Sequence, residues 1–358
     1  MAPRLATNSA MSSQTRNRIL MLGDVMLGEN LYHFRRGIRT KYSGRYEDII
    51  MSDVRKVLFY DIDLLFFNLE YSLVPNGFLF NNIESAVYRG EVDGLGGLPK
   101  NVLQIANIAN NHFSQHGPES AQFTKAVLRK HNILIVGKSR NPTSVEVNGR
   151  IIKFWGASLV PDLRYCDEYF LSTYEGLCRE LSGMGKKGNE IWAISLHWGV
   201  EYSSTPSERQ TRLAKDLVNM GFDIIIGHHP HVVQPLVRYG NGLVIFSLGN
   251  FISDQNFSTA TQQGLAVKLD LVGNVLSQVV TTRQKNHAIV EAVEIDSKLL
   301  TARVGNLQRR STFMMRLLMK LELVFHLWEV NRQTIKLLVS RFFEKCFRGL
   351  ANREKGNN

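Results

Sequence analysis

Polar side chains that could bind metal ions or move protons recur through the first two thirds of the chain. In chain order they are Asp24, Asn68, Glu70, Asn110, Asn111, His112, His197, His228, His229, His231 and Asn250. Carboxylate, carboxamide and imidazole donors together suit borderline divalent metals such as Mn²⁺, Zn²⁺ or Fe²⁺, and not an all-oxygen calcium cage. A carboxylate can bridge two ions, and two ions ~3.5–4 Å apart can clamp the attacking and leaving oxygens of a phosphoryl displacement. We therefore expect a metal-dependent hydrolase of the two-metal type.

The segment Gly227-His-His-Pro-His231 is the strongest single signal in this set. In an extended segment the rings of His229 and His231, two residues apart, would point to the same side. Several imidazoles placed together are hard to justify without a metal ion or a switch. A lone histidine after a strand is more often structural, so the inference depends on the clusters occurring together. His112, beside Asn111, could protonate a leaving oxygen.

Each polar cluster follows a short apolar run that is typical of a buried strand. The runs are Ile19–Leu22, Asp63–Phe67, Ile105–Ala109, Ile191–Leu196, Asp223–Ile226 and Leu243–Phe246. Between them, helical periodicity covers Glu119–His131 and Ser207–Met220, the second with Ser207 as N-cap and Gly221 as the stop signal. Alternating strands and helices predict an α/β fold with parallel pairing, in which sites form at the carboxyl ends of strands.

Two further segments carry weaker signals. Residues 75–100 contain several glycines and little periodicity, which predicts a long loop over one edge and a candidate substrate lid. Residues 264–295 show strand-like alternation, and we assign them to the last part of a second sheet.

A family resemblance appears in six ordered motifs that lie within residues 19–255. They are Gly23-Asp-Val-Met-Leu-Gly28, Asn68-Leu-Glu70, Ala109-Asn-Asn-His112, His197-Trp-Gly-Val-Glu-Tyr202, Gly227-His-His-Pro-His231 and Ser247-Leu-Gly-Asn-Phe251. This set resembles the bacterial capsule-synthesis family (CapA-type, poly-γ-glutamate biosynthesis), within the calcineurin-like metallophosphoesterase superfamily. The resemblance implies a four-layer α/β/β/α sandwich, metallophosphatase-like, with a dinuclear metal centre between its two sheets. We expect this domain to span residues 19–300, between a disordered tail (1–18) and a basic helical tail (301–358).

The resemblance also assigns roles to single residues. The implied metal ligands are Asp24, Glu70, Asn111, His197, His229 and His231. Among them, Asp24 and His231 would bind the first ion, while Asn111, His197 and His229 would bind the second. Glu70 would be the bridging carboxylate, with Asn68 as the alternative. His112 would be the catalytic acid or base, and three more family positions, Glu201, Gln234 and Asn250, would contact the ligands or the substrate.

Three departures from the family pattern affect this assignment. Met26 stands where phosphoesterases of this type usually have a histidine, so the first ion is one ligand short. Gln115 stands where an aspartate commonly follows the Asn-Asn-His motif. The well-known capsule proteins carry an N-terminal membrane anchor, whereas residues 1–18 contain no apolar stretch, and we expect neither an anchor nor a signal peptide there.

The net charge of +11 is concentrated at the two ends of the chain. Residues 1–18 carry +3 and residues 309–358 carry +7, which leaves +1 for residues 19–308. A nearly neutral body without interleaved basic and aromatic residues beside the motifs argues against a nucleic-acid partner, and against a nuclease of the same superfamily.

The C-terminal segment 313–347 mixes Met, Leu, Phe and Trp with regularly spaced basic residues. This pattern favours an amphipathic helical tail on anionic lipid or on a synthase partner, and a helical hairpin packed on the body is the alternative. No apolar run of 18 residues occurs, so we expect no transmembrane helix. The three cysteines match no metal or disulfide spacing and indicate a reducing compartment. We expect a cytoplasmic protein that can lie at the inner membrane.

Two functional hypotheses follow. The first is a hydrolase of capsule or polymer biosynthesis that uses two divalent ions (Mn, Fe or Zn) on a phosphoester or an anionic polymer. The second is a non-catalytic accessory subunit that binds polymer or a partner at a membrane synthase.

Overall fold

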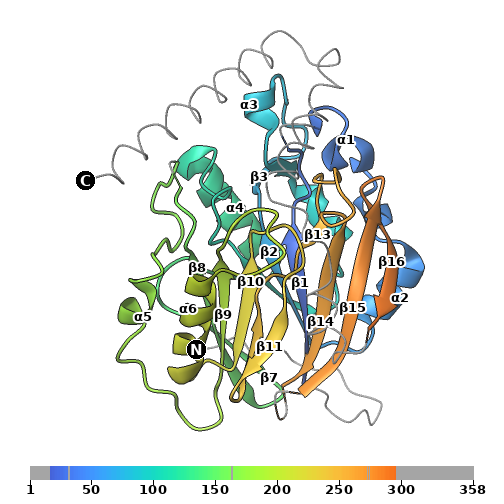
Figure 1. Ribbon diagram of the computed structural model, residues 1–358. Helices are drawn as coiled ribbons and strands as arrows, with labels where there is room; N and C mark the ends of the chain where they lie inside the picture. Colours follow the sequence, from blue (N-terminus) through green and yellow to red (C-terminus); the bar gives the residue numbers. More distant parts are fainter. Residues whose placement is uncertain (1–16, 31–32, 163, 272, 274, 296–358) are drawn as a thin grey trace.

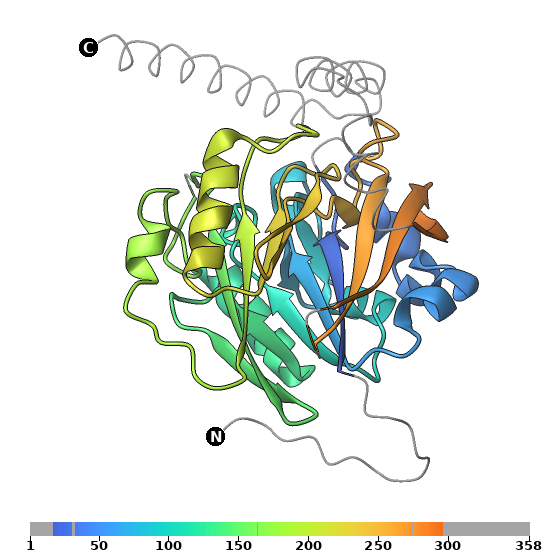
Figure 2. The same cartoon turned by 60° about the horizontal axis from the view of Figure 1, so that its bottom comes forward.

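The computed structural model describes residues 17–30, 33–162, 164–271, 273 and 275–295. Two large β-sheets pack face to face in this part of the chain, with helices on their outer faces (Figures 1 and 2). Residues 1–16 and 296–358 lie outside the described residues, so the two predicted tails remain predictions. Among the described residues, no helix has the length and apolar character needed to cross a membrane.

The first sheet has the strand order β16-β15-β14-β1-β2-β5-β6, and β13 also pairs with β1. Its strands are β1 (Arg18–Val25), β2 (Leu64–Leu69), β5 (Leu103–Asn107), β6 (Ile133–Val136), β13 (Asn250–Ile252), β14 (Gln263–Asp270), β15 (Val275–Lys285) and β16 (Ala288–Glu294). The strands β1, β2, β5 and β6 are mutually parallel, as the sequence predicted.

The second sheet has the strand order β11-β12-β10-β9-β8-β7. Its strands are β7 (Thr143–Val147), β8 (Arg150–Ser158), β9 (Ile191–His197), β10 (Ile224–His228), β11 (Leu236–Tyr239) and β12 (Gly242–Ile245). The four central strands β8, β9, β10 and β12 are parallel, and antiparallel strands close both edges.

The helices lie at the periphery of the two sheets. They are α1 (Ile38–Tyr42), α2 (Ser52–Phe59), α3 (Ile83–Ala86), α4 (Gly117–Lys130), α5 (Leu177–Glu180) and α6 (Glu208–Asn219), with 3-10 turns η2 (Tyr46–Ile49) and η3 (Val92–Gly97). The predicted helix at 207–220 is confirmed with its cap, because Ser207 and Gln210 form a reciprocal capping box. The predicted helix at 119–131 is confirmed as α4, with Pro118 in its first turn.

Alternating side chains of the strands divide the hydrophobic core into three clusters. In β1, Ile19 and Met21 point toward the second sheet and belong to the cluster between the sheets, while Leu20 and Leu22 belong to the outer cluster beneath α2 and α4. In β9, Ile191 and Ala193 face the cluster between the sheets. The intervening Trp192 and Ile194 join a third cluster, which packs against α5 and α6. Three apolar interfaces separate four layers, so the α/β/β/α sandwich is confirmed.

The assignment of residues 264–295 to a second sheet is wrong. β14 pairs antiparallel with β1 from Arg18 to Leu22, so β14, β15 and β16 extend the first sheet (orange, Figure 1). Alternation along a strand predicts that a strand forms and which side chains share a face, but it carries no information about the neighbouring strand.

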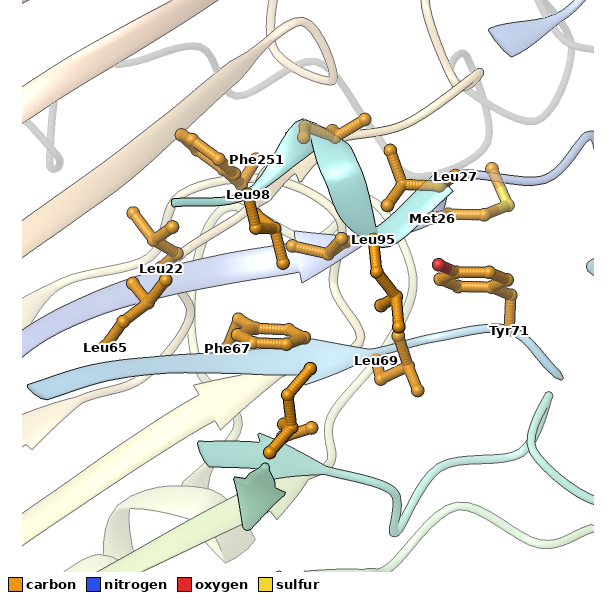
Figure 3. Close-up of a cluster of buried hydrophobic side chains, with 14 of the residues drawn as sticks. Leu22, Met26, Leu27, Leu65, Phe67, Leu69, Tyr71, Leu95, Leu98 and Phe251 are labelled. Atoms are coloured by element: carbon orange, nitrogen blue, oxygen red, sulfur yellow. The ribbon is translucent and has the colours of Figure 1, made fainter. Parts of the chain in front are cut away.

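The expectation that residues 75–100 form a long loop is also wrong. This segment contains α3, the strand β4 (Arg89–Glu91) and η3, and β4 pairs with β3 (Ser72–Val74). Leu95 and Leu98 of this segment are buried in the outer cluster against Leu27 (Figure 3). Packing of these two leucines holds residues 92–98 against the body, which does not suit a lid.

Candidate metal centre

Strand register places the polar residues of the first sheet in one row at its carboxyl edge. Asp24 of β1 lies opposite Asn68 of β2 and Asn250 of β13, and Asn68 lies opposite Asn107 of β5. In the second sheet, His197 of β9 lies opposite His228 of β10. The central strands of both sheets are parallel, so their last residues collect at one end of the sandwich.

Two glycines allow the strands to approach closely at this edge. A Cβ atom on Gly23, just before Asp24, would lie 2.0 Å from the carbonyl oxygen of Gly249. A Cβ atom on Gly227, just before His228, would lie 1.9 Å from the carbonyl oxygen of Phe246. Neither position can accept a side chain, so glycine is required at both strand ends.

Asp24, Glu70 and His231 form one buried group of possible metal ligands, with one donor atom of each within 4.8 Å of the others. Oδ2 of Asp24 lies 3.2 Å from Nδ1 of His231. On the other side of the same ring, Nε2 of His231 lies 3.6 Å from Oε1 of Glu70.

Glu70, His197 and His229 form a second buried group at the same spacing. Nε2 of His197 lies 3.6 Å from Oε1 of Glu70 and 2.8 Å from Oδ1 of Asn111. Glu70 is therefore shared by both groups, and Asn111 joins the second through His197. This is the arrangement that a carboxylate bridging two ions requires.

All six residues predicted as metal ligands thus come together, and their roles as ligands stay predictions. His112, the predicted acid or base, lies beside them with Nε2 4.0 Å from Oε1 of Glu70. Its Nδ1 is 3.0 Å from Oε1 of Gln115, and burial lowers the pKa of His112 to about 4. A neutral ring that donates from Nδ1 to Gln115 presents Nε2 as a proton acceptor at neutral pH.

His229 and His231 do not lie in an extended segment, as their spacing had suggested. β10 ends at His228, and the backbone φ angles of His229 and His231 are +95° and +58°. Non-glycine residues rarely adopt positive φ, and such strain is found where surrounding structure enforces it, often at functional sites. The two ring centroids are 5.9 Å apart because a left-handed turn brings them together.

Without a bound cation, the pKa values in the cluster shift in both directions: although burial opposes ionisation of His231, the Glu70 and Asp24 carboxylates raise its pKa to about 10. Burial and the neighbouring Asp24 carboxylate raise the pKa of Glu70 well above its usual range. Although burial opposes ionisation of Asp24, hydrogen bonds with His228 and His231 hold its pKa well below the usual value. Burial lowers the pKa of His229 to about 4 and that of His197 well below 6.5, which keeps both imidazoles neutral, as metal ligands must be.

Buried donor and acceptor atoms in the cluster support a cation directly. Among the described residues, Oε1 of Glu70, Nδ1 of His229 and Nε2 of His228 are buried without a hydrogen-bond partner. Leaving such an atom unsatisfied costs about 1–3 kcal/mol, and more if it is charged. Divalent ions among these groups would offset that cost, so the residues present fit a metal centre.

Met26 does not take part in the centre. Its side chain is 3% exposed and belongs to the outer hydrophobic cluster, with Leu27 and Tyr71 (Figure 3). Position 26 therefore contributes no ligand, and the group of Asp24, Glu70 and His231 offers three.

Several buried side chains hold the candidate ligands in place. Asn107 donates to Oδ1 of Asn68 at 2.9 Å, and Asn68 donates to Oδ1 of Asp24 at 2.9 Å. This use of its amide makes Asn68 a support for Asp24, and the geometry favours Glu70 as the shared ligand. Oδ1 of Asn250 lies 3.1 Å from Nδ1 of His231.

The sequence analysis assigned no role to two residues of the site. His228 is fully buried, and its Nδ1 lies 3.1 Å from Oδ1 of Asp24. The histidine-rich motif contained His228, but only His229 and His231 were assigned as ligands. Tyr88 stacks on His112, with ring centroids 3.6 Å apart. No sequence pattern indicated Tyr88, since it comes from the segment interpreted as a loop.

The two-sheet fold and the paired carboxylate and histidine groups define a metallophosphatase-like protein. Residues 18–255 match the family described as bacterial capsule synthesis protein PGA_cap. The chain belongs to this family, as its motifs predicted.

Relatives with assigned names are similar to this chain over part of their length. The capsule biosynthesis protein CapA of Bacillus anthracis is 32% identical over 186 residues, 48% of this chain and 44% of that protein. The PGA biosynthesis protein CapA of Bacillus subtilis (strain 168) is 29% identical over 221 residues, 58% of each chain. The chain thus spans about half the length of these relatives.

Among solved structures, a 5'-nucleotidase precursor from Thermus thermophilus is similar over 81% of this chain and 57% of its own. The TM-score is 0.40 and the sequence identity is 12%. A likeness of this size adds nothing to the fold beyond the sheet topology described above.

Proposed function

We propose that the protein is a metal-dependent hydrolase of capsule or polymer biosynthesis that works with two divalent ions. The observation that carries the proposal is the shared position of Glu70, whose Oε1 lies 3.6 Å from Nε2 of both His197 and His231. Mn²⁺, Fe²⁺ or Zn²⁺ suit these donors.

The ligands on each side would hold one ion. Asp24, Glu70 and His231 would hold the first, while Glu70, Asn111, His197 and His229 would hold the second. When bound, the ions would polarise phosphoryl or acyl oxygens of the substrate. His112, held by Gln115 and Tyr88, would accept a proton at Nε2 from the attacking group and return it to the leaving oxygen.

The substrate class follows from the family and the cations. A phosphoester or an anionic polymer such as a γ-linked glutamyl chain would bring negative charge to a centre of bound divalent ions. The names of the two Bacillus relatives, one of capsule and one of PGA biosynthesis, agree with a polymer of this kind.

The test measures metal content and turnover of the purified full chain. We expect about two Mn²⁺, Fe²⁺ or Zn²⁺ ions per chain, and Mn²⁺-dependent hydrolysis of bis-p-nitrophenyl phosphate or of γ-glutamyl oligomers. His197→Ala and His229→Ala should abolish turnover and release metal. His131→Ala is the matched control, because His131 is exposed at the end of α4, outside the candidate centre. Full activity after complete removal of metal by a chelator would disprove the proposal.

A second candidate is a non-catalytic accessory subunit that binds polymer or a partner at a membrane synthase. The burial of Met26 outside the candidate centre favours it, because a first ion held by three ligands would bind weakly. This hypothesis predicts that metal-loaded protein binds polymer but turns over none of the assayed substrates.

The basic segment 301–358 would bring the protein to the inner membrane from the cytoplasm under either hypothesis. Co-sedimentation with vesicles containing anionic lipid tests this. Deletion of residues 301–358 should abolish binding, and equal binding by the shortened chain would exclude lipid attachment through the tail.

A further inference from the structure

Glu201 reaches the candidate centre from a loop of the second sheet, four residues beyond His197 at the end of β9. The backbone N–H of Tyr202 donates to the carbonyl of Pro230 at 2.7 Å, inside the histidine-rich turn. Gln234 donates to the carbonyl of Ser203 at 2.8 Å from the other side. The loop therefore has a fixed position relative to His229 and His231.

The Glu201 carboxylate forms a third group of possible metal ligands with His229 and His231. One donor atom of each lies within 4.8 Å of the others. Each imidazole also belongs to a group that contains Glu70. The half-buried Glu201 side chain thus lies near one candidate ligand of each ion position, His231 of the first and His229 of the second.

The number of donors differs between the two positions. The second position has Glu70, His197 and His229, with Asn111 2.8 Å from His197. The first has only Asp24, Glu70 and His231, because the side chain of Met26 lies in the outer cluster. The first position thus has one protein donor fewer than the second, and one fewer than the four that hold an ion most tightly in closed sites.

The charge of the centre also favours a third carboxylate ligand. Two divalent ions bring four positive charges, and Asp24 and Glu70 offset two of them. A third carboxylate brings the buried centre closer to neutrality, which lowers the desolvation cost of holding both ions.

We propose that Glu201, in the loop after β9 of the second sheet, is the fourth ligand of the first ion. It takes the place of the ligand that Met26, after β1 of the first sheet, does not provide. This assignment rests on the proposed two-metal function. It makes Glu201 a ligand in place of the contact to ligands or substrate that the family resemblance implied.

The experiment compares Mn²⁺ binding to metal-free full-length wild type, Glu201→Gln and Glu201→Asp by calorimetry and electron paramagnetic resonance. Wild type should bind two ions and give the signal of an exchange-coupled pair. Glu201→Gln should weaken one ion by roughly 10–100-fold or more, because even residues that only support ligands have effects of that size. The signal of the exchange-coupled pair should then be replaced by the signal of single Mn²⁺ ions. The Mn²⁺ affinity of Glu201→Asp should lie between those of wild type and Glu201→Gln.

A matched control variant and a double variant show which of the two ions Glu201 binds. Glu208→Gln removes an exposed carboxylate from the first turn of α6 and should bind both ions like wild type. In a His197→Ala background, which removes the second position, Glu201→Gln should still weaken the remaining ion. Thermal unfolding of the metal-free variants checks that each is folded.

The possible failures are distinguishable. Two ions bound by Glu201→Gln with wild-type affinity would overturn the role of Glu201 and leave the two-metal function standing. Loss of turnover with both ions retained would also overturn it, and would make Glu201 a substrate contact. Wild type that binds fewer than two ions would overturn the proposed function itself.

Discussion

The aromatic ring of Tyr88 stacks on the imidazole of His112, with centroids 3.6 Å apart and planes inclined by 23°. Tyr88 is fixed by backbone hydrogen bonds to Glu29 at 2.7 Å and from Ser72 at 3.1 Å. A ring held on one face by Tyr88 and at Nδ1 by Gln115 has little freedom to turn. The strand pair β3–β4 therefore serves the centre by positioning His112, which lies in the turn after β5 of the first sheet.

Tyr88→Leu removes this stacking and should lower kcat about 3–10-fold, since aromatic pairs contribute about 0.5–1.5 kcal/mol. Metal content should not change. Tyr88→Phe keeps the ring and should behave like wild type in the same steady-state assay. A Tyr88→Phe variant as slow as Tyr88→Leu would show that the hydroxyl, and not the stacking, matters.

Asn68→Leu removes the donor that orients Asp24 and should weaken metal binding by about 10–100-fold. Glu70→Gln removes the shared carboxylate and should weaken both ions more strongly. Calorimetric titration of metal-free protein with Mn²⁺ measures both effects. If Asn68→Leu lost both ions while Glu70→Gln kept them, the shared ligand would be Asn68.

Gly227→Ala places a Cβ atom 1.9 Å from the carbonyl oxygen of Phe246, which directly follows β12. This carbonyl can move away only if the ends of β10 and β12 separate. We expect a loss of about 3 kcal/mol in the free energy of unfolding, the upper end for overpacking. Gly96→Ala is the control, because no heavy atom lies within 4 Å of the added carbon. Urea denaturation measures both variants, and equal stabilities would contradict the close approach of β10 and the end of β12.

The buried carboxyl of Asp254, outside the metal centre, should make the free energy of unfolding depend on pH. Burial raises the pKa of this carboxyl from 3.8 to about 7, although it accepts backbone hydrogen bonds from Asn30 and Ile38. The native state then binds a proton that the unfolded chain releases near pH 4. The contribution of Asp254 to stability is therefore complete below pH 4 and is lost as the pH rises through about 7.

Asp254→Asn mimics the protonated carboxyl and should remove this dependence. The difference in unfolding free energy between variant and wild type should grow in favour of the variant from pH 5 to pH 8. His287 lies near the carboxylate, with its Nδ1 3.3 Å from Oδ1 of Asp254, and it is present in both proteins, so the comparison uses the difference between them. A difference that is constant with pH would mean that Asp254 is ionised throughout the range.

The polar clusters and their positions after apolar runs were predictable from the sequence. Buried parallel strands need continuous apolar runs such as Leu64–Phe67, and residues at their carboxyl ends must collect at one edge. The capped helix at Ser207 was predictable for a similarly local reason, since its cap and stop signals lie within a few residues of it.

Residue types and chain order determined which side chains could bind metal, from Asp24 to His231, because donor chemistry is a property of each side chain. Tertiary structure alone decided that Glu70 lies between His197 and His231, that Tyr88 covers His112 and that Met26 turns into the outer cluster. It also decided that residues 264–295 join the first sheet. These relationships depend on contacts between residues far apart in the chain, and a local pattern fixes the face of a strand but not its neighbour.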